Sequence, residues 1–155
     1  MLATRMIDTL LRLDAFLPYR LSFTSNLVSE RVAGTYRAMF DLSIPEWRLI
    51  AVIAEGDGIS QQAIGTRTRM DKVTVSRAAI ALTDRGLLER APNPDDKRSH
   101  LLRLSAAGRE LHAAVAPKAL ELECVIFANF TKAELDGFTV MLRRIDAAAL
   151  DLDGG

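Results

Sequence analysis

A charged turn between two strand-like stretches constrains the fold of this chain more than any other feature of its sequence. "LLER" (87–90) begins as a short strand does, and "RSHLLRLS" (98–105) alternates apolar and polar residues like a half-buried strand. The intervening "APNPDDK" (91–97) is polar, and Pro92 and Pro94 should prevent regular pairing there. The pattern predicts a β-hairpin with a protruding charged tip, whose second strand places His100, Leu102 and Leu104 on one side and Leu101 and Arg103 on the other.

Three capped helices are expected directly before this hairpin. Ser43 can cap the first, and Glu46, three residues later, completes a capping box. Ser60 caps a short second helix, and Asp71 caps a third that Gly86 ends. The last two helices are joined by a tight connection, so they form a candidate helix-turn-helix, and the hairpin forms a candidate wing.

The second helix of this pair is expected to have two distinct faces. Val75, Ala79 and Leu82 recur at helical spacing and predict its buried face. In a helix-turn-helix the second helix enters the major groove with its N-terminal residues against the bases. Arginine and hydroxyl side chains can bond to bases or phosphates there, and lysine adds charge beside the positive helix terminus. The side chains expected to face DNA are Lys72, Thr74, Ser76 and Arg77.

Helices are also expected on both sides of this central region. Residues 1–16 have the pattern of an amphipathic helix rather than a secretory signal and form a short arm, and Pro18 lies near the start of a long helix that reaches about residue 40. Ser105 opens a helix through about residue 129, and Thr131 with Glu134 makes a capping box for the last helix. Spacings of three and four along that helix predict a seam for packing on other helices, made of Leu135, Phe138, Leu142, Ile145, Ala149 and Leu152.

Basic side chains are concentrated in the middle of a chain whose formal net charge is zero. Residues 60–105 carry nine Lys or Arg against five Asp or Glu, whereas residues 106–155 carry five against eight. Such asymmetry indicates a local anionic partner better than the total charge does. A chance distribution is the alternative, because the excess is modest.

Other classes of protein are disfavoured by the sequence. No apolar run approaches the roughly 18 residues of a membrane span. Cys124 is the only cysteine, so no internal disulfide can form, and the two histidines lack the cluster that a metal site needs. Ser99 and His100 are adjacent, so on a strand they cannot form a nucleophile and base pair, and no glycine loop for phosphate is present. We expect a cytoplasmic protein that is not an enzyme and uses no metal, cofactor or membrane.

The central helix and the hairpin carry a recognisable pattern. The stretches "DKVTVSRAAIALTDRGLLER" (71–90) and "NPDDKRSHLLRLSAAGRE" (93–110) resemble the MarR family of winged helix-turn-helix transcriptional regulators. "LPYRLS" (17–22) and "LSIPEWRLIAVI" (42–53) resemble its first two helices, so the resemblance covers nearly the whole chain. The family's wing pattern of Asp-x-Arg-Ser, alternating apolar residues, Leu-Ser and Gly is met by Asp96, Arg98, Ser99, Leu104, Ser105 and Gly108.

The resemblance implies a mainly α fold with a small β-hairpin wing. A winged helix-turn-helix lobe (42–105) would be flanked by dimerisation helices at the N-terminus (1–41) and the C-terminus (106–155). The implied function is a homodimer that binds double-stranded DNA at a pseudo-palindromic operator, more often as a repressor than as an activator.

The resemblance also assigns roles in the wing. Arg98 would reach the minor groove, Asp96 would help to hold it, and Lys97 would lie beside them. A narrow minor groove has enhanced negative potential, which attracts an inserted arginine. Asp95 and Asp96 would repel DNA unless at least one of them is paired, and the alternative is a solvated surface turn.

Many members of the family release DNA when a small aromatic or phenolic acid binds. Tyr19, Arg20, Ser25 and Trp47 could line such a site, with an aromatic wall and an arginine for the carboxylate. The alternative is that Trp47 is core and Arg20 a surface residue. Cys124 is expected to be a small core residue rather than a redox sensor, since the sensing cysteines of relatives lie near the first helix.

A winged-helix module that binds another protein, without specific DNA binding, is the main rival function. It would share the fold but would not need Arg77, Arg98 or the positive middle of the chain.

Overall fold

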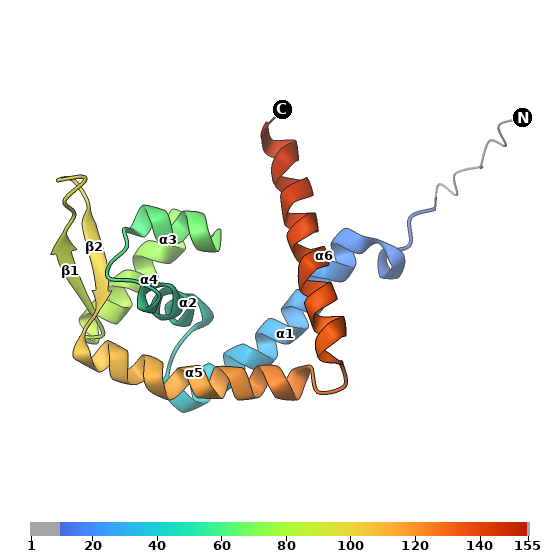
Figure 1. The fold of residues 1–155 in the computed structure, drawn as a ribbon, viewed down its shortest axis with the longest axis horizontal. Coiled ribbons are helices and arrows are strands. Elements are labelled where there is room, and N and C mark those ends of the chain that lie inside the picture. The colour runs from blue at the N-terminus through green and yellow to red at the C-terminus, as the bar shows by residue number, and fades with distance from the viewer. Residues whose placement is uncertain (1–9, 155) are drawn as a thin grey trace, which may run out of the picture. The chain divides into compact units, whose positions relative to one another are not determined.

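The computed structural model describes residues 10–154, so much of the expected N-terminal arm, residues 1–9, lies outside the described residues. A 3-10 turn at Leu13–Ala15 precedes the long helix α1 (Leu17–Phe40), which has Pro18 in its first turn, where a missing N–H costs no hydrogen bond. The expected long first helix is confirmed, whereas the described part of the expected amphipathic helix, residues 10–16, holds a single 3-10 turn and no α-helix. Figure 1 shows it followed by α2 (Ile44–Ala54), α3 (Gln61–Thr68), α4 (Lys72–Asp84), β1 (Leu88–Pro92), β2 (His100–Leu104), α5 (Ala106–Ile126), α6 (Lys132–Asp151) and a last 3-10 turn at Leu152–Gly154.

The caps predicted for α2, α3 and α4 are present. Ser43 Oγ accepts from the backbone N–H of Glu46, while Glu46 Oε1 accepts from the N–H of Ser43, which completes the capping box. Ser60 Oγ accepts from Ala63 N–H at the start of α3. Gly86 follows α4 with φ of 73°, a left-handed conformation that glycine adopts without a steric penalty.

One hydrophobic core joins these three helices to the hairpin. The apolar residues predicted to face inward from α4 are buried, and α2 packs against both α4 and β2. Each buried Val, Leu or Ile side chain contributes about 1.5–3 kcal/mol on full burial. The side chains that are less than 2% exposed are Leu42, Leu49, Ile50, Ile53, Ile64, Val75, Ala79, Leu82, Leu102 and Val115.

The first strand reaches two residues past its expected end, because Pro92 takes part in the pairing, whereas the second strand is shorter than the expected 98–105. The strands are antiparallel, with Leu88 opposite Leu104 and Pro92 opposite His100. The expectation that Pro92 prevents pairing is therefore wrong. Within residues 10–154, β1 pairs with β2 alone, so a proline in this outer strand does not break a ladder on a second side.

A backbone bridge anchors the wing to the helices. Leu102 N–H donates to Ile59 O at 2.8 Å, and Ile59 N–H donates to Leu102 O at 3.2 Å. Ile59 lies in the connection between α2 and α3, so the second strand has partners on both sides at this point. The bridge fixes the wing beside the helix-turn-helix.

The described chain divides into two compact units, one up to Ala119 and one from Leu120, with α5 spanning the boundary. α5 ends at Ile126, three residues before the expected end. In the second unit Thr131 and Glu134 form the predicted capping box. Cys124 is exposed, so its expected place in a core is wrong for the single chain: it lies on the solvent side of its helix.

The predicted seam of α6 is largely solvent-accessible in the single chain. Leu135 and Leu142 are half-buried, while Phe138 and Ile145 are each 44% exposed. Among the described residues, no helix combines the length and the apolar character needed to span a membrane.

Candidate nucleic-acid interface

Helix α4 separates its buried and exposed side chains as the sequence predicts. Val75, Ala78, Ala79 and Leu82 are buried. Lys72 and Arg77 are exposed on the N-terminal half of the same helix, away from this buried face, and Thr74 and Ser76 are half-buried beside them. The helix therefore presents two cations and two hydroxyls at its N-terminal half, where the helix dipole also favours an anion.

The hydrogen bonds of Thr74 limit the groups that its hydroxyl can bind. Its N–H donates to Asp71 Oδ1 and its hydroxyl donates to Asp71 Oδ2, both at 2.8 Å. The hydroxyl proton is thus used within the cap, and the oxygen is left as an acceptor, suited to a base amino group rather than to a phosphate. These bonds lower the pKa of Asp71 below its ordinary value, because they favour the charged carboxylate.

The wing tip holds its two cations on an ordered turn. Lys97 and Arg98 are exposed there. Asp96 Oδ1 accepts from the backbone N–H of Arg98 at 2.9 Å, and Asp96 O accepts from Ser99 N–H. Asp96 therefore acts on the backbone of Arg98, a different contact from a carboxylate paired with the guanidinium. One of the two tip carboxylates, that of Asp96, is hydrogen-bonded to a backbone N–H, which orders the turn and leaves the carboxylate charged.

Asn93 is part of the tip and was missed by the sequence reasoning. Its side-chain N–H donates to Ser99 Oγ at 2.8 Å, and its Oδ1 accepts from Asp95 N–H at 3.0 Å. Asparagine before proline is a common start of a turn, so the "NP" pair was a usable signal. Asn93 ties the two sides of the turn together.

A groove of about 590 Å³ runs between α3 and α4. The first helix of a helix-turn-helix crosses the DNA backbone, so polar side chains at this position suit phosphate contacts. Gln61 and Gln62 are not among the residues that the sequence pattern predicts to face DNA. The lining residues are Gln61, Gln62, Gly65, Thr66, Lys72 and Val75.

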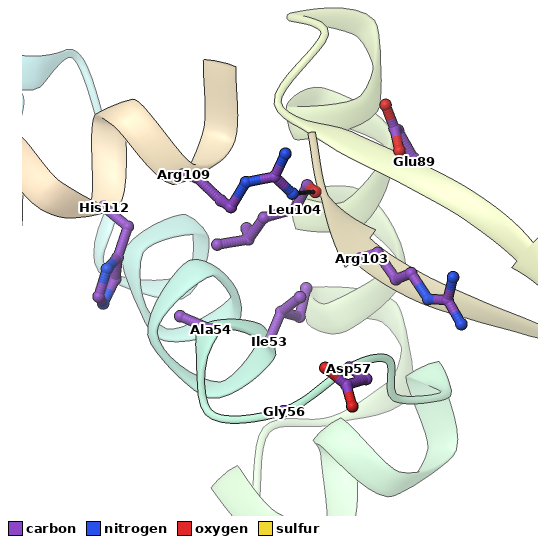
Figure 2. Close-up of a pocket in the computed structure, with 9 residues that line it drawn as sticks. All are labelled: Ile53, Ala54, Gly56, Asp57, Glu89, Arg103, Leu104, Arg109 and His112. Carbon is purple, nitrogen blue, oxygen red and sulfur yellow. Dashed lines mark hydrogen bonds between the residues drawn. The ribbon is translucent and has the colours of Figure 1, made fainter. Parts of the chain in front are cut away.

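A second hollow, of about 810 Å³, lies between α2, β2 and the start of α5 (Figure 2). Arg109 Nη1 donates to Leu104 O at 3.0 Å, and His112 stacks on Trp47 with ring centroids 5.8 Å apart. Arg103 contributes a further guanidinium from β2. Within the described residues, no group of three or more metal-ligating side chains is found. The hollow is lined by Ile53, Ala54, Gly56, Asp57, Glu89, Arg103, Leu104, Arg109 and His112.

The four predicted ligand residues are not brought together within one chain. Trp47 packs between Tyr36 and His112, half-buried at the edge of the core, and burial raises the pKa of the Tyr36 hydroxyl. Arg20 lies on α1 about 24 Å from Tyr36, at a rise of roughly 1.5 Å per residue. Along with Tyr19 it contacts Phe23 instead, the Arg20 guanidinium carbon lying 5.2 Å from that ring centre. Ser25 is exposed farther along α1.

Sequence relatives of the chain are regulators of transcription. Residues 40–99 match the family model described as the MarR family. The uncharacterised HTH-type transcriptional regulator YdcH of Bacillus subtilis (strain 168) is 30% identical over 120 residues, which cover 74% of this chain and 82% of that protein.

Solved structures have the same fold. A MarR/EmrR family transcriptional regulator from Acinetobacter sp. ADP1 superposes with a TM-score of 0.84 at 24% identity, covering 91% of this chain and 99% of that one. PcaV of Streptomyces coelicolor, solved in complex with its natural ligand, superposes with a TM-score of 0.72 at 24% identity, covering 90% and 98%. From the winged helix-turn-helix geometry and from these relatives, the chain belongs to the MarR family of transcriptional regulators.

Proposed function

We propose that the chain acts as a homodimeric, ligand-responsive repressor that binds a pseudo-palindromic DNA operator. The observation that carries the proposal is the pairing of an exposed basic N-terminal half of α4 with an ordered basic wing tip. Arg77 reads a base edge in the major groove, Lys72 contacts phosphate, and Thr74 and Ser76 bond beside them. Lys97 and Arg98 hold the neighbouring minor groove.

Exposed apolar side chains support the dimer. Leu17 is 72% exposed and Leu27 51% exposed on α1, and Phe138 and Met141 are exposed on α6. A water-soluble monomer rarely exposes so many large apolar groups on helices. In this proposal residues 1–41 and 106–155 form the dimer layer, and residues 42–105 form the DNA-binding lobe.

The hollow beside α2 supports an anionic aromatic effector. Arg103 and Arg109 offer cationic donors for a carboxylate, and His112, which also lines the hollow, stacks on Trp47. Tyr19, Arg20 and Ser25 could join this site only from a second copy of the chain, because they lie far along α1 from Trp47. The ligand would act by favouring dimers whose two recognition helices, the α4 helices, are wrongly spaced for DNA.

Selection from a random duplex DNA pool tests the DNA-binding function. We expect enrichment of a two-fold symmetric site, with affinity that falls steeply as salt rises because phosphate contacts release counterions. Binding that is weak and blind to sequence would contradict an operator-specific repressor. An absence of binding even at low salt would favour a winged-helix module that binds a protein. A reporter gene placed downstream of the selected site shows whether the protein represses or activates transcription.

The fluorescence of Trp47, the only tryptophan in the sequence, tests the effector site. Benzoate and 4-hydroxybenzoate should change this fluorescence saturably and release the selected DNA, whereas uncharged benzyl alcohol should do neither. Arg109→Met should weaken the binding of benzoate and 4-hydroxybenzoate, and it should leave the fluorescence with benzyl alcohol unchanged. Equal responses to acid and alcohol would contradict an anion site.

A further inference from the structure

Arg85 lies where the recognition helix ends and connects that end to two other helices. It is the C-cap residue of α4, and its backbone N–H donates to Ala81 O at 3.2 Å. Gly86 then turns the chain away toward β1. The Arg85 side chain does not follow the chain but reaches the last residues of α1.

The guanidinium of Arg85 contacts the ends of α1 and α2. Nη1 donates to Asp41 O at 2.8 Å and Nη2 donates to Phe40 O at 3.4 Å. Nη1 also lies 3.8 Å from Glu46 Oε2. The other oxygen of that carboxylate accepts from Ser43 N–H in the α2 capping box. A single side chain thus bridges the end of α1, the start of α2 and the end of α4.

These contacts match the electrostatics of the helix ends. The last carbonyls of α1 lack partners within the helix and carry its negative dipole end, which a cation stabilises. The C-cap residue of α1 is Asp41, which has φ of 51°, so its carbonyl is turned away from the helical direction. The Arg85 side chain is 37% exposed, so the ion pair itself adds little stability, and its fixed planar geometry is the more important property.

The Arg85 side chain joins α1 and α4 directly, and both of these helices also pack on α2. α1 packs on α2, and α2 packs on α4. α1 belongs to the proposed dimer layer, and α4 is the proposed recognition helix. A change in the angle of α4 relative to α1 would change the separation of the two recognition helices in a dimer.

We propose that Arg85 is a positioning residue that sets the spacing between the two recognition helices by holding the end of α4 against the end of α1. This inference rests on the proposed homodimeric DNA-binding function. It assigns Arg85 no contact with DNA. It predicts a loss of geometric selectivity rather than a uniform loss of affinity.

The test uses the full-length protein and the selected operator, with variants in which one base pair is added or removed between the half-sites. One base pair changes the separation by about 3.4 Å and the relative rotation by about 34°. Arg85→Met, which keeps the aliphatic length and removes the donors, should reduce the preference for the native spacing at least about fivefold, the lower end of a coupling between sites. Arg85→Lys keeps the charge but lacks the two guanidinium nitrogens that donate to Asp41 O and Phe40 O, so it should reduce the spacing preference less.

Arg37→Met is the matched control. Arg37 pairs with the Asp41 carboxylate at 3.2 Å, at the same end of α1, but within that helix only. This variant should keep the wild-type spacing preference. Thermal unfolding of each variant separates folding defects from positioning defects.

Each outcome decides between the two proposals. An unchanged spacing preference in folded Arg85→Met overturns the role of Arg85, as does an equal loss of affinity for every spacing. If Arg85→Met does not fold, an unchanged preference in Arg85→Lys overturns it instead. If the wild-type protein itself has no symmetric site or no preferred spacing, the proposed function fails first, and the role of Arg85 fails with it.

Discussion

The carboxylate of Asp96 accepts a hydrogen bond from the backbone N–H of Arg98 at 2.9 Å. The bond fixes the backbone from which the Arg98 side chain projects and leaves its guanidinium free to reach DNA. A carboxylate at the tip of a DNA-binding wing would otherwise be unfavourable. The relationship explains why the acid and the base lie two residues apart.

Asp96→Ala and Asp96→Asn separate this hydrogen bond from the charge. Both substitutions remove a negative charge near DNA, but asparagine keeps an acceptor oxygen. Asp96→Ala should therefore bind the operator more weakly than Asp96→Asn by about 0.5–1.5 kcal/mol, the usual net contribution of one hydrogen bond. Fluorescence anisotropy with labelled operator DNA measures the difference. Equal affinities for the two variants would show that Asp96 does not order the turn for binding.

Arg77→Ala and Lys72→Ala should have different effects on DNA binding. Loss of a base contact at Arg77 should cost about 1–3 kcal/mol and relax the preference at one base position. Loss of a phosphate contact at Lys72 should weaken binding to all DNA sequences alike. It should also reduce the number of counterions released on binding by about one, which lowers the salt dependence of the affinity. Binding to a set of single-base operator variants across a salt series measures both effects. A uniform loss for Arg77→Ala would place that side chain on phosphate.

The local parts of this fold could be predicted from the sequence because their causes are local. Ser43, Asp71 and Thr131 each accept from an N–H three residues ahead, so the cap and its partner are read from adjacent letters. The two faces of α4 follow from helical spacing alone. The charged wing tip follows from a polar stretch with two prolines between two strand-like stretches.

The long-range parts could not be predicted, because they depend on which segments meet in space. The pairing of Pro92 depends on β1 being an outer strand, and the bridge from Ile59 to Leu102 joins residues far apart in sequence. The contact of Arg85 with Asp41 spans 44 residues. The separation of Arg20 from Trp47 was available from the length of α1, and the sequence reasoning did not use it.

Gly108→Ala should destabilise the protein, because α5 approaches the backbone before β1 at this position. A Cβ on Gly108 would overlap the Leu87 carbonyl oxygen, which also accepts from Ser105 N–H at 3.1 Å. Overpacking of this kind costs about 1–3 kcal/mol. Gly137→Ala is the matched control: a Cβ there meets no heavy atom within 4 Å, so it should stabilise α6 by up to about 1 kcal/mol. Urea unfolding measures the change in the free energy of unfolding for both variants. A Gly108→Ala variant that is as stable as the wild type, or more stable, would contradict this close approach.

Asp71 should make the stability of the protein depend on pH in the acidic range. Hydrogen bonds from the N–H and hydroxyl of Thr74 hold the pKa of Asp71 below its ordinary value, so the folded state binds this proton less readily than the unfolded state. Its contribution is therefore complete above the unfolded pKa, near pH 4, and is lost as the pH falls through the lower folded pKa. Asp71→Asn keeps an acceptor for the backbone N–H but cannot titrate. The difference in melting temperature between wild type and Asp71→Asn should be largest at neutral pH and should shrink in acid, whereas a constant difference from pH 7 to pH 3 would show that the charge of the cap contributes nothing.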